Sequence, residues 1–79
     1  MDEKLFLKKL GQNIRRIRKE RKLTQVELGY RCDFERPSMN RIEAGNTNPT
    51  ALTLKKLAEA LEVSIEEFFK FETKEKSKK

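Results

Sequence analysis

The sequence predicts a small, compact all-α domain of five helices. Apolar residues recur every three or four positions, which places them on one face of each predicted helix. A helix-start pattern, Ser or Thr followed three residues later by Glu, occurs in LTQVEL and again in VSIEEF. A chain of 79 residues holds one domain and is near the size at which a single core becomes marginal. We therefore expect one domain over residues 1–71 that gains stability from a partner subunit.

The first two helices are expected at about residues 2–21 and 25–32. The apolar stripe of the first helix has residues spaced by three, four and three positions, namely Leu7, Leu10, Ile14 and Ile17. Thr24 is the predicted N-cap of the second helix, and Glu27 completes a capping box with it. The apolar residues that flank this box as a hydrophobic staple are Leu23 and Leu28. Both helices are therefore specified by local signals.

The fourth and fifth helices are expected at about residues 51–61 and 65–71. Thr50 is the predicted N-cap of the fourth helix. The apolar residues on one face of this helix are Ala51, Leu54, Leu57, Ala58 and Leu61. Ser64 and Glu67 repeat the capping-box pattern, so we expect the fifth helix to start there. The apolar residues that flank this second box are Val63 and Phe68.

A short third helix is expected at about residues 36–43. Its apolar positions Met39 and Ile42 fall on one side, and most of its polar residues fall on the other. A helix this short is not stable alone in water, so we expect its apolar edge to be held by the other helices. Pro37 lacks an N–H and disfavours helical geometry in the preceding residue, so we expect it to be the first helical residue, with Arg36 just outside.

The formal net charge of +6 is concentrated at the start of the chain. Residues 1–23 contain nine Lys and Arg against three Asp and Glu. A basic region of this kind suits a polyanion such as nucleic acid, although a solvated helix face is an equally good interpretation of charge alone. The tail, residues 72–79, has no apolar residue and is expected to be a disordered charged segment.

Several function classes are excluded by composition. There is one cysteine, Cys32, and no histidine, so neither a disulfide within the chain nor a Cys/His zinc site is expected. No catalytic constellation and no glycine-rich phosphate loop is present, so we expect no enzyme activity, no cofactor and no small-molecule ligand. No apolar run approaches the roughly 20 residues that cross a bilayer. A cytoplasmic protein, with Cys32 as a packed small residue, is expected.

Several motifs together resemble one known family across about residues 10–69. The matching segments are Leu10-Gly11, Arg18, LTQVEL, RIEAG, NP and LKKLAEALEVS. They resemble the phage repressor and Cro family of helix-turn-helix proteins, also called XRE-type. The resemblance implies a five-helix lambda-repressor-like domain whose third helix enters the DNA major groove, usually as a dimer. The small size is similar to that of the controller proteins of restriction-modification systems.

The resemblance implies a sequence-specific transcriptional regulator that binds double-stranded DNA as a homodimer on a pseudo-palindromic operator. An antitoxin or another protein-interaction module with the same fold is the alternative. The positions that face base edges or nearby phosphates in the family are matched here by Arg36, Pro37, Ser38, Asn40 and Arg41. We expect Arg36 and Arg41 to contact bases, since the guanidinium fork matches guanine O6 and N7, while Asn40 pairs with adenine or reaches a phosphate. For each of these residues a non-specific phosphate contact is the alternative.

Other matched positions are expected to hold the DNA backbone or the fold. Gln25 opens the second helix, where the family holds a phosphate, and a glutamine without such a role is the alternative. The loop after the third helix contains three residues that contact phosphate in the family or simply form a turn: Asn46, Thr47 and Asn48. Arg18 and Glu43 match a structural ion pair that is buried in phage members and ties the first helix to the third.

The sequence departs from the family pattern at three positions. Asp33 occupies the turn position that usually holds a glycine with positive φ. Gly29 replaces the usual alanine in the second helix, which is expected to weaken this helix by about 1 kcal/mol. Glu35 lies at the expected cap of the third helix, where it is a poor capping residue.

Some apolar residues have no evident place inside so small a fold. Ile65, Phe68 and Phe69 can form one face of the fifth helix, but Phe71 and Leu52 lie outside the predicted stripes. We therefore expect a homodimer interface that contains Leu52, Phe69 and Phe71. The alternative is ordinary exposure of scattered apolar residues.

Overall fold

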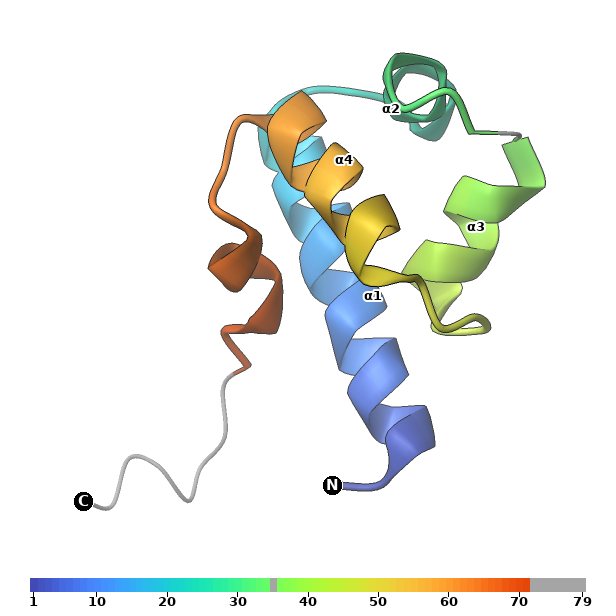
Figure 1. Cartoon of the computed structure of the whole chain (residues 1–79), viewed down its shortest axis with the longest axis vertical. Helices are drawn as coiled ribbons and strands as arrows, with labels where there is room; N and C mark the ends of the chain where they lie inside the picture. Colours follow the sequence, from blue (N-terminus) through green and yellow to red (C-terminus); the bar gives the residue numbers. More distant parts are fainter. Residues whose placement is uncertain (35, 72–79) are drawn as a thin grey trace.

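The computed structural model describes residues 1–34 and 36–71, with only the backbone of residues 36 and 37. Over these residues the protein is all-α, as predicted: four α-helices are followed by one 3₁₀ helix, and no strand is present. The elements are α1 (Glu3–Glu20), α2 (Gln25–Arg31), α3 (Arg36–Ala44), α4 (Ala51–Leu61) and η1 (Ile65–Phe69). Figure 1 shows the long helix α1 at the centre, with α3 and η1 on opposite sides of it. The predicted tail, 72–79, lies outside the described residues.

The starts of α1, α2 and α4 are fixed by side-chain caps. The Asp2 carboxylate accepts a hydrogen bond from the Leu5 N–H at 2.8 Å. The predicted capping box of α2 is confirmed, because the Glu27 N–H donates to Thr24 Oγ1 at 3.0 Å and the Thr24 N–H donates to Glu27 Oε1 at 2.8 Å. Thr50 caps α4 in the same manner. These bonds satisfy N–H groups that have no acceptor within the helix.

The predicted capping box at Ser64 is wrong. The Ser64 side chain makes no capping hydrogen bond; instead the Glu67 N–H donates to the Ser64 carbonyl at 3.0 Å, as the tighter 3₁₀ turn requires. The Glu67 carboxylate accepts a hydrogen bond from Lys70 Nζ at 3.0 Å. The fifth helix is therefore a 3₁₀ helix that ends at Phe69 and not an α-helix over 65–71.

One apolar core joins all five elements. The predicted stripe of α1 is confirmed, with Leu10, Ile14 and Ile17 buried and Leu7 half-buried. The other buried apolar residues are Leu28, Cys32, Met39, Ile42, Leu54, Leu57, Ala58, Leu61 and Phe68. Cys32 is a packed core residue, as expected, and burial raises the pKa of its thiol. This core holds the short helix α3 by its apolar edge.

Two glycines allow α1 to approach the end of α3 closely. A Cβ atom at Gly11 would lie 2.6 Å from the Glu43 carbonyl oxygen and closer still to that of Ile42. Gly45, which follows α3, has a φ of +79°, and its Cβ would lie 2.7 Å from the Cα of Lys8. A side chain at either position would therefore push α1 and α3 apart.

Two departures from the family pattern lie in or close to the turn between α2 and α3. Asp33 has a φ of +62°, so it does occupy the left-handed position that usually holds glycine. Gly29 is buried, and a Cβ there would lie 3.3 Å from Cγ of Met39. Gly29 thus makes room for Met39, and its effect is not only the loss of helix propensity that the sequence indicates.

The start of α3 differs from the expectation. Arg36 is the first residue of α3 and Pro37 the second, so the prediction that Arg36 lies outside the helix is wrong. Proline fits anywhere in the first turn, because the N–H groups there have no acceptor within the helix. Glu35, the expected cap, lies outside the described residues.

Candidate nucleic-acid interface

The two sides of α3 have different environments. On its inner side, Met39 and Ile42 are buried in the core. On its outer side, Asn40 and Arg41 are exposed, and their side chains make no hydrogen bond to any residue that the structure describes. Arg36 and Pro37 form the first turn of the same helix. The helix is thus anchored by one side and presents polar side chains on the other, as the sequence predicts.

A shallow hollow of about 230 Å³ connects α3 to the loop that follows it. Ser38 and Arg41 line this hollow from α3, and Thr47 and Asn48 line it from the loop. The sequence assigns these four residues to two groups, the third helix and the loop after it. The structure places both groups at one surface. Asn46 is also exposed and follows Gly45, and its N–H donates to the Arg41 carbonyl at 2.9 Å.

The far edge of this hollow contains residues that sequence reasoning did not assign to the site. Thr50 and Thr53, at the start of α4, line it together with Pro49. The Thr50 hydroxyl donates to Thr53 Oγ1 at 3.0 Å. The cap pattern identified Thr50 only as a helix start. Its position beside α3 depends on how α4 folds back, which no local pattern reveals.

The predicted ion pair between Arg18 and Glu43 is present and buried. Arg18 Nε donates to Glu43 Oε2 at 2.6 Å, and Nη2 donates to Oε1 at 3.0 Å. Each residue is only 6% exposed. Arg18 Nη1 also donates to the Leu23 carbonyl at 2.7 Å, which ties the pair to the segment before α2. This two-point contact ties α1 to α3.

Gln25 belongs to the same network, which the sequence did not reveal. Its Nε2 donates to Glu43 Oε1 at 3.0 Å, although the two residues are 18 positions apart. The side chain is half-buried, and the bond to Glu43 uses one of its two amide hydrogens. Gln25 is therefore a structural link between α2 and α3, and its amide makes no second hydrogen bond to the residues that the structure describes.

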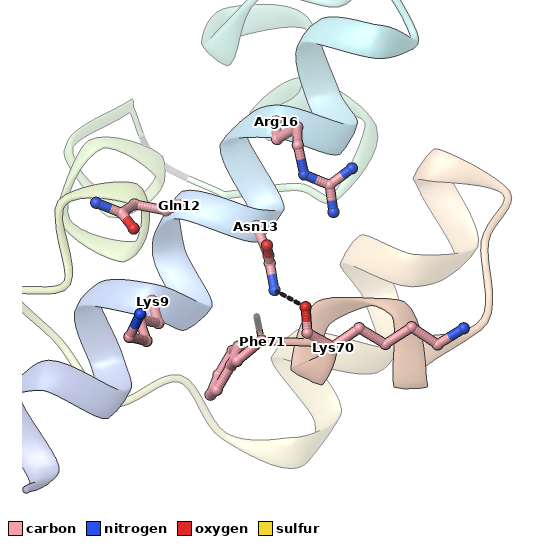
Figure 2. A pocket seen from close by; sticks show the side chains of 6 residues that line it. All are labelled: Lys9, Gln12, Asn13, Arg16, Lys70 and Phe71. Carbon is pink, nitrogen blue, oxygen red and sulfur yellow. Dashed lines mark hydrogen bonds between the residues drawn. The ribbon is translucent and has the colours of Figure 1, made fainter. Parts of the chain in front are cut away.

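A second basic region is formed by residues of α1 and by Lys70 and Phe71, which follow η1. Figure 1 shows η1 on the side of α1 opposite to α3. Lys9, Arg16 and Lys70 line a pocket of about 410 Å³ there. Figure 2 shows Asn13 reaching across to the backbone of Lys70, with the Lys70 side chain extending away from Lys9. Asn13 Nδ2 also donates to the Phe68 carbonyl at 3.0 Å.

The charges of this pocket are largely compensated by neighbouring carboxylates. Arg16 bonds to Glu20 at 3.1 Å and Lys70 to Glu67 at 3.0 Å. The hydrogen bond to Glu67 and its negative charge raise the pKa of Lys70. The outward side of α3, where Arg41 is not paired with any described carboxylate, is the better surface for a polyanion.

The aromatic residues near the C-terminal end of the fold form one cluster with α1. The rings of Phe6 and Phe71 meet edge to face at a centroid distance of 5.4 Å, and those of Phe6 and Phe69 stack at 6.1 Å. Phe71 is half-buried against the core, so the expectation that it has no internal place is wrong. Leu52, in contrast, is 71% exposed.

The fold and the exposed side of α3 define a helix-turn-helix domain. The chain belongs to the Helix-turn-helix family of DNA-binding transcription regulators, whose family model matches residues 14–68. In the described part of the chain, none of the helices has the length and hydrophobicity to cross a membrane.

Relatives in sequence carry names of the same class. The chain is 44% identical over 57 residues to the uncharacterized HTH-type transcriptional regulator y4dJ of Sinorhizobium fredii. That match covers 72% of this chain and 74% of the relative. It is 43% identical over 56 residues to the immunity repressor protein of Bacillus phage phi105. That match covers 71% of this chain but only 39% of the phage protein.

Solved structures of controller proteins have the same fold. The restriction-modification controller protein C.AhdI from Aeromonas hydrophila superposes with a TM-score of 0.78 and 32% identity, over 80% of this chain and 96% of that one. The controller protein C.Esp1396I, solved as a tetramer in complex with its natural 35-base-pair operator, has a TM-score of 0.73 and 34% identity. That match covers 81% of this chain and 84% of the controller protein.

Proposed function

We propose that the protein regulates transcription as a homodimer that binds a pseudo-palindromic operator, with α3 of each copy in a major groove. The observation that carries this proposal is the anchoring of α3: its inner side is fixed by the core and the Arg18–Glu43 pair, and its outer side is polar and free. A rigid helix that presents donors is what reading base edges requires. The solved complex of C.Esp1396I with its operator supports DNA as the ligand.

Within this proposal, Arg41 and Arg36 read bases, and Arg41 donates its guanidinium fork to a guanine. Asn40 pairs with an adenine or holds a phosphate, and Pro37 and Ser38 lie against the DNA nearby. Support comes from the exposure of Asn40 and Arg41 on one helix face and from the hollow that Ser38 shares with the following loop.

Phosphate contacts are proposed on both sides of α3. Gln25 uses its remaining amide hydrogen, and the loop residues Asn46, Thr47 and Asn48 use their short polar side chains. Such contacts fix the register of α3 on the duplex without carrying sequence information. The bond from Gln25 to Glu43 supports this assignment because it holds the amide in one orientation.

The homodimer is proposed to bury Leu52 and Phe69, and Phe71 packs against Phe69 in the aromatic cluster. Leu52 and Phe69 are both exposed, and the aromatic cluster gives Phe69 a fixed position. A core this small gains stability from a partner subunit. We place the regulator in the cytoplasm and assign it no cofactor and no catalytic activity.

One observation favours a second candidate function, that of a protein-interaction module such as an antitoxin. Val26 and Tyr30 lie four residues apart on α2 and are 56% and 87% exposed. Two large apolar side chains on one face of a helix are suited to a protein partner. This candidate predicts that a protein, and not duplex DNA, is the tight ligand.

Selection of bound sites from random duplex DNA, followed by footprinting and light scattering, tests the proposed function. We expect a pseudo-palindrome whose half-sites lie about 34 Å apart, protected by a dimer. Affinity should fall by about three decades between 50 and 200 mM salt if roughly six phosphates are contacted. A flat salt response with no selected sequence would contradict DNA as the ligand, and a monomer on a single half-site would contradict the dimer.

A further inference from the structure

A stripe of positive charge runs along one face of α1 and is not used by the interface described above. It consists of Lys4, Lys8, Arg15 and Lys19, spaced by four, seven and four residues. This spacing places all four side chains on the same side of the helix, over a length of about 22 Å. All four are exposed. We refer to these four residues as the α1 stripe.

The α1 stripe differs in its ion pairing from three other surface cations. Arg16, Lys55 and Lys70 each pair with a glutamate three or four residues away. No member of the stripe forms an ion pair with any residue in 1–34 or 36–71. Like charges four residues apart also repel along a helix, as at Lys4 and Lys8. Within the described part of the chain, the charges of the stripe are therefore not offset by ion pairs, and they are suited to a polyanion.

The position of the stripe links it to the two ends of the proposed DNA interface. At one end, the Cα of Lys8 lies directly against Gly45, the residue before the 46–48 loop. At the other end, Lys19 follows Arg18, which bonds to Leu23 just before α2. Between these ends, Gly11 brings α1 against the end of α3. The stripe thus borders the elements that are proposed to hold phosphates.

We propose that the α1 stripe binds the phosphates of the duplex DNA that flanks each half-site. The inference rests on the proposed function, since it extends the same duplex beyond the base pairs that α3 contacts. Duplex DNA carries one negative charge per roughly 1.7 Å of axis, so a basic stripe about 22 Å long can neutralise several phosphates. These contacts add affinity and salt dependence but no sequence preference.

The test compares two variants of equal net charge on two duplexes. The stripe variant carries Lys8→Gln, Arg15→Gln and Lys19→Gln; the control carries Lys55→Gln, Lys56→Gln and Lys70→Gln, on α4 and after η1. The short duplex contains only the selected site, and the long duplex adds about one helical turn, 10 base pairs, at each end. Circular dichroism and thermal unfolding first establish that both variants fold. If the triple stripe variant does not fold, the single variant Lys8→Gln replaces it.

On the long duplex, the stripe variant is expected to bind at least about tenfold more weakly than wild type, with a salt slope shallower by about 1 for each lost phosphate contact. On the short duplex, and for the control on either duplex, the change should stay within about threefold. Equal losses for the stripe and control variants, or a stripe loss that is independent of duplex length, would overturn the inference. A stripe variant that binds both duplexes like wild type but binds an acidic protein more weakly would also overturn the inference.

Failure of the flanking-DNA inference can be distinguished from failure of the proposed function. The stripe variant should retain the wild-type base preferences, because phosphate contacts do not read sequence. If wild type itself selects no sequence from random DNA, the proposed function fails. If wild type selects a site and the long and short duplexes respond alike, only the flanking-DNA inference fails.

Discussion

The two sides of α3 differ in how far contacts within the protein fix their side chains. On the inner side, Glu43 accepts three hydrogen bonds from two other segments, and Met39 is completely buried. On the outer side, Asn40 and Arg41 contact no other described side chain by hydrogen bonding. The inner side thus fixes the position of α3, and the outer side carries the polar groups that can contact DNA. Substitutions on the inner side should change the free energy of unfolding, and those on the outer side should change DNA binding alone.

Glu43→Ala should give the largest effect. It leaves the guanidinium of Arg18 buried without its partner, which should lower the free energy of unfolding by about 3–5 kcal/mol. Urea unfolding followed by circular dichroism measures this change. As a control, replacing both partners, as in Arg18→Met with Glu43→Leu, should recover most of the loss, because no buried charge remains. Similar losses in the single and double variants would show that packing, and not the ion pair, is responsible.

Gly11→Ala tests the close approach of α1 to α3. The added Cβ would meet two backbone carbonyl oxygens at 2.6 Å or less, so the helices must shift. We expect a loss of about 1–3 kcal/mol of unfolding free energy, together with weaker DNA binding because α3 moves. Gln12→Ala, on the exposed face next to it, is the control and should be nearly neutral. A stable Gly11→Ala variant with normal DNA binding would contradict the close contact.

Glu62→Gly should stabilise the protein slightly at a site remote from α3. Glu62 ends α4 with a φ of 60° and a ψ of 43°, a left-handed conformation that glycine adopts without strain. We expect a gain of about 0.5–1 kcal/mol in unfolding free energy and unchanged DNA binding. Glu62→Ala removes the same charge but keeps the Cβ atom, so it should give no gain. Equal gains in the two variants would assign the effect to charge.

The sequence predicted the elements whose determinants are local. The apolar stripe of α1, the capping box of Thr24 and the buried side of α3 depend on residues within a few positions of one another. The errors arose where distant segments decide the outcome. Phe71 is half-buried because Phe6, at the other end of the chain, packs against it, and Gln25 bonds to Glu43 because α2 and α3 fold together. The local pattern at Ser64 also failed, since η1 adopts a tighter turn than a capping box requires.

Of the candidate interface, the outer residues of α3 could be proposed from their positions in the family pattern. Their grouping with Thr50 and Thr53 around one hollow could not, because it depends on the path of the loop from α3 to α4. The positive charge of residues 1–23 was evident from the sequence, but which of these cations form ion pairs became evident only in three dimensions. Arg16 and Arg18 are paired, and the members of the α1 stripe are not paired with any residue that the structure describes.

In the proposed function, the inner side of α3 fixes its position and the outer side reads DNA. The most direct test of this division is competition binding of Arg41→Ala against every single-base variant of the selected site. We expect a loss of about 1–3 kcal/mol per half-site on the cognate sequence and a relaxed preference at one base pair. The free energy of unfolding should stay within about 0.5 kcal/mol of wild type. Gln25→Ala, measured beside it, should weaken all sequences alike and cost about 1 kcal/mol of stability through the lost bond to Glu43. Uniform binding losses for both variants, with the same base preferences as wild type, would contradict the assignment of Arg41 as a reader of sequence.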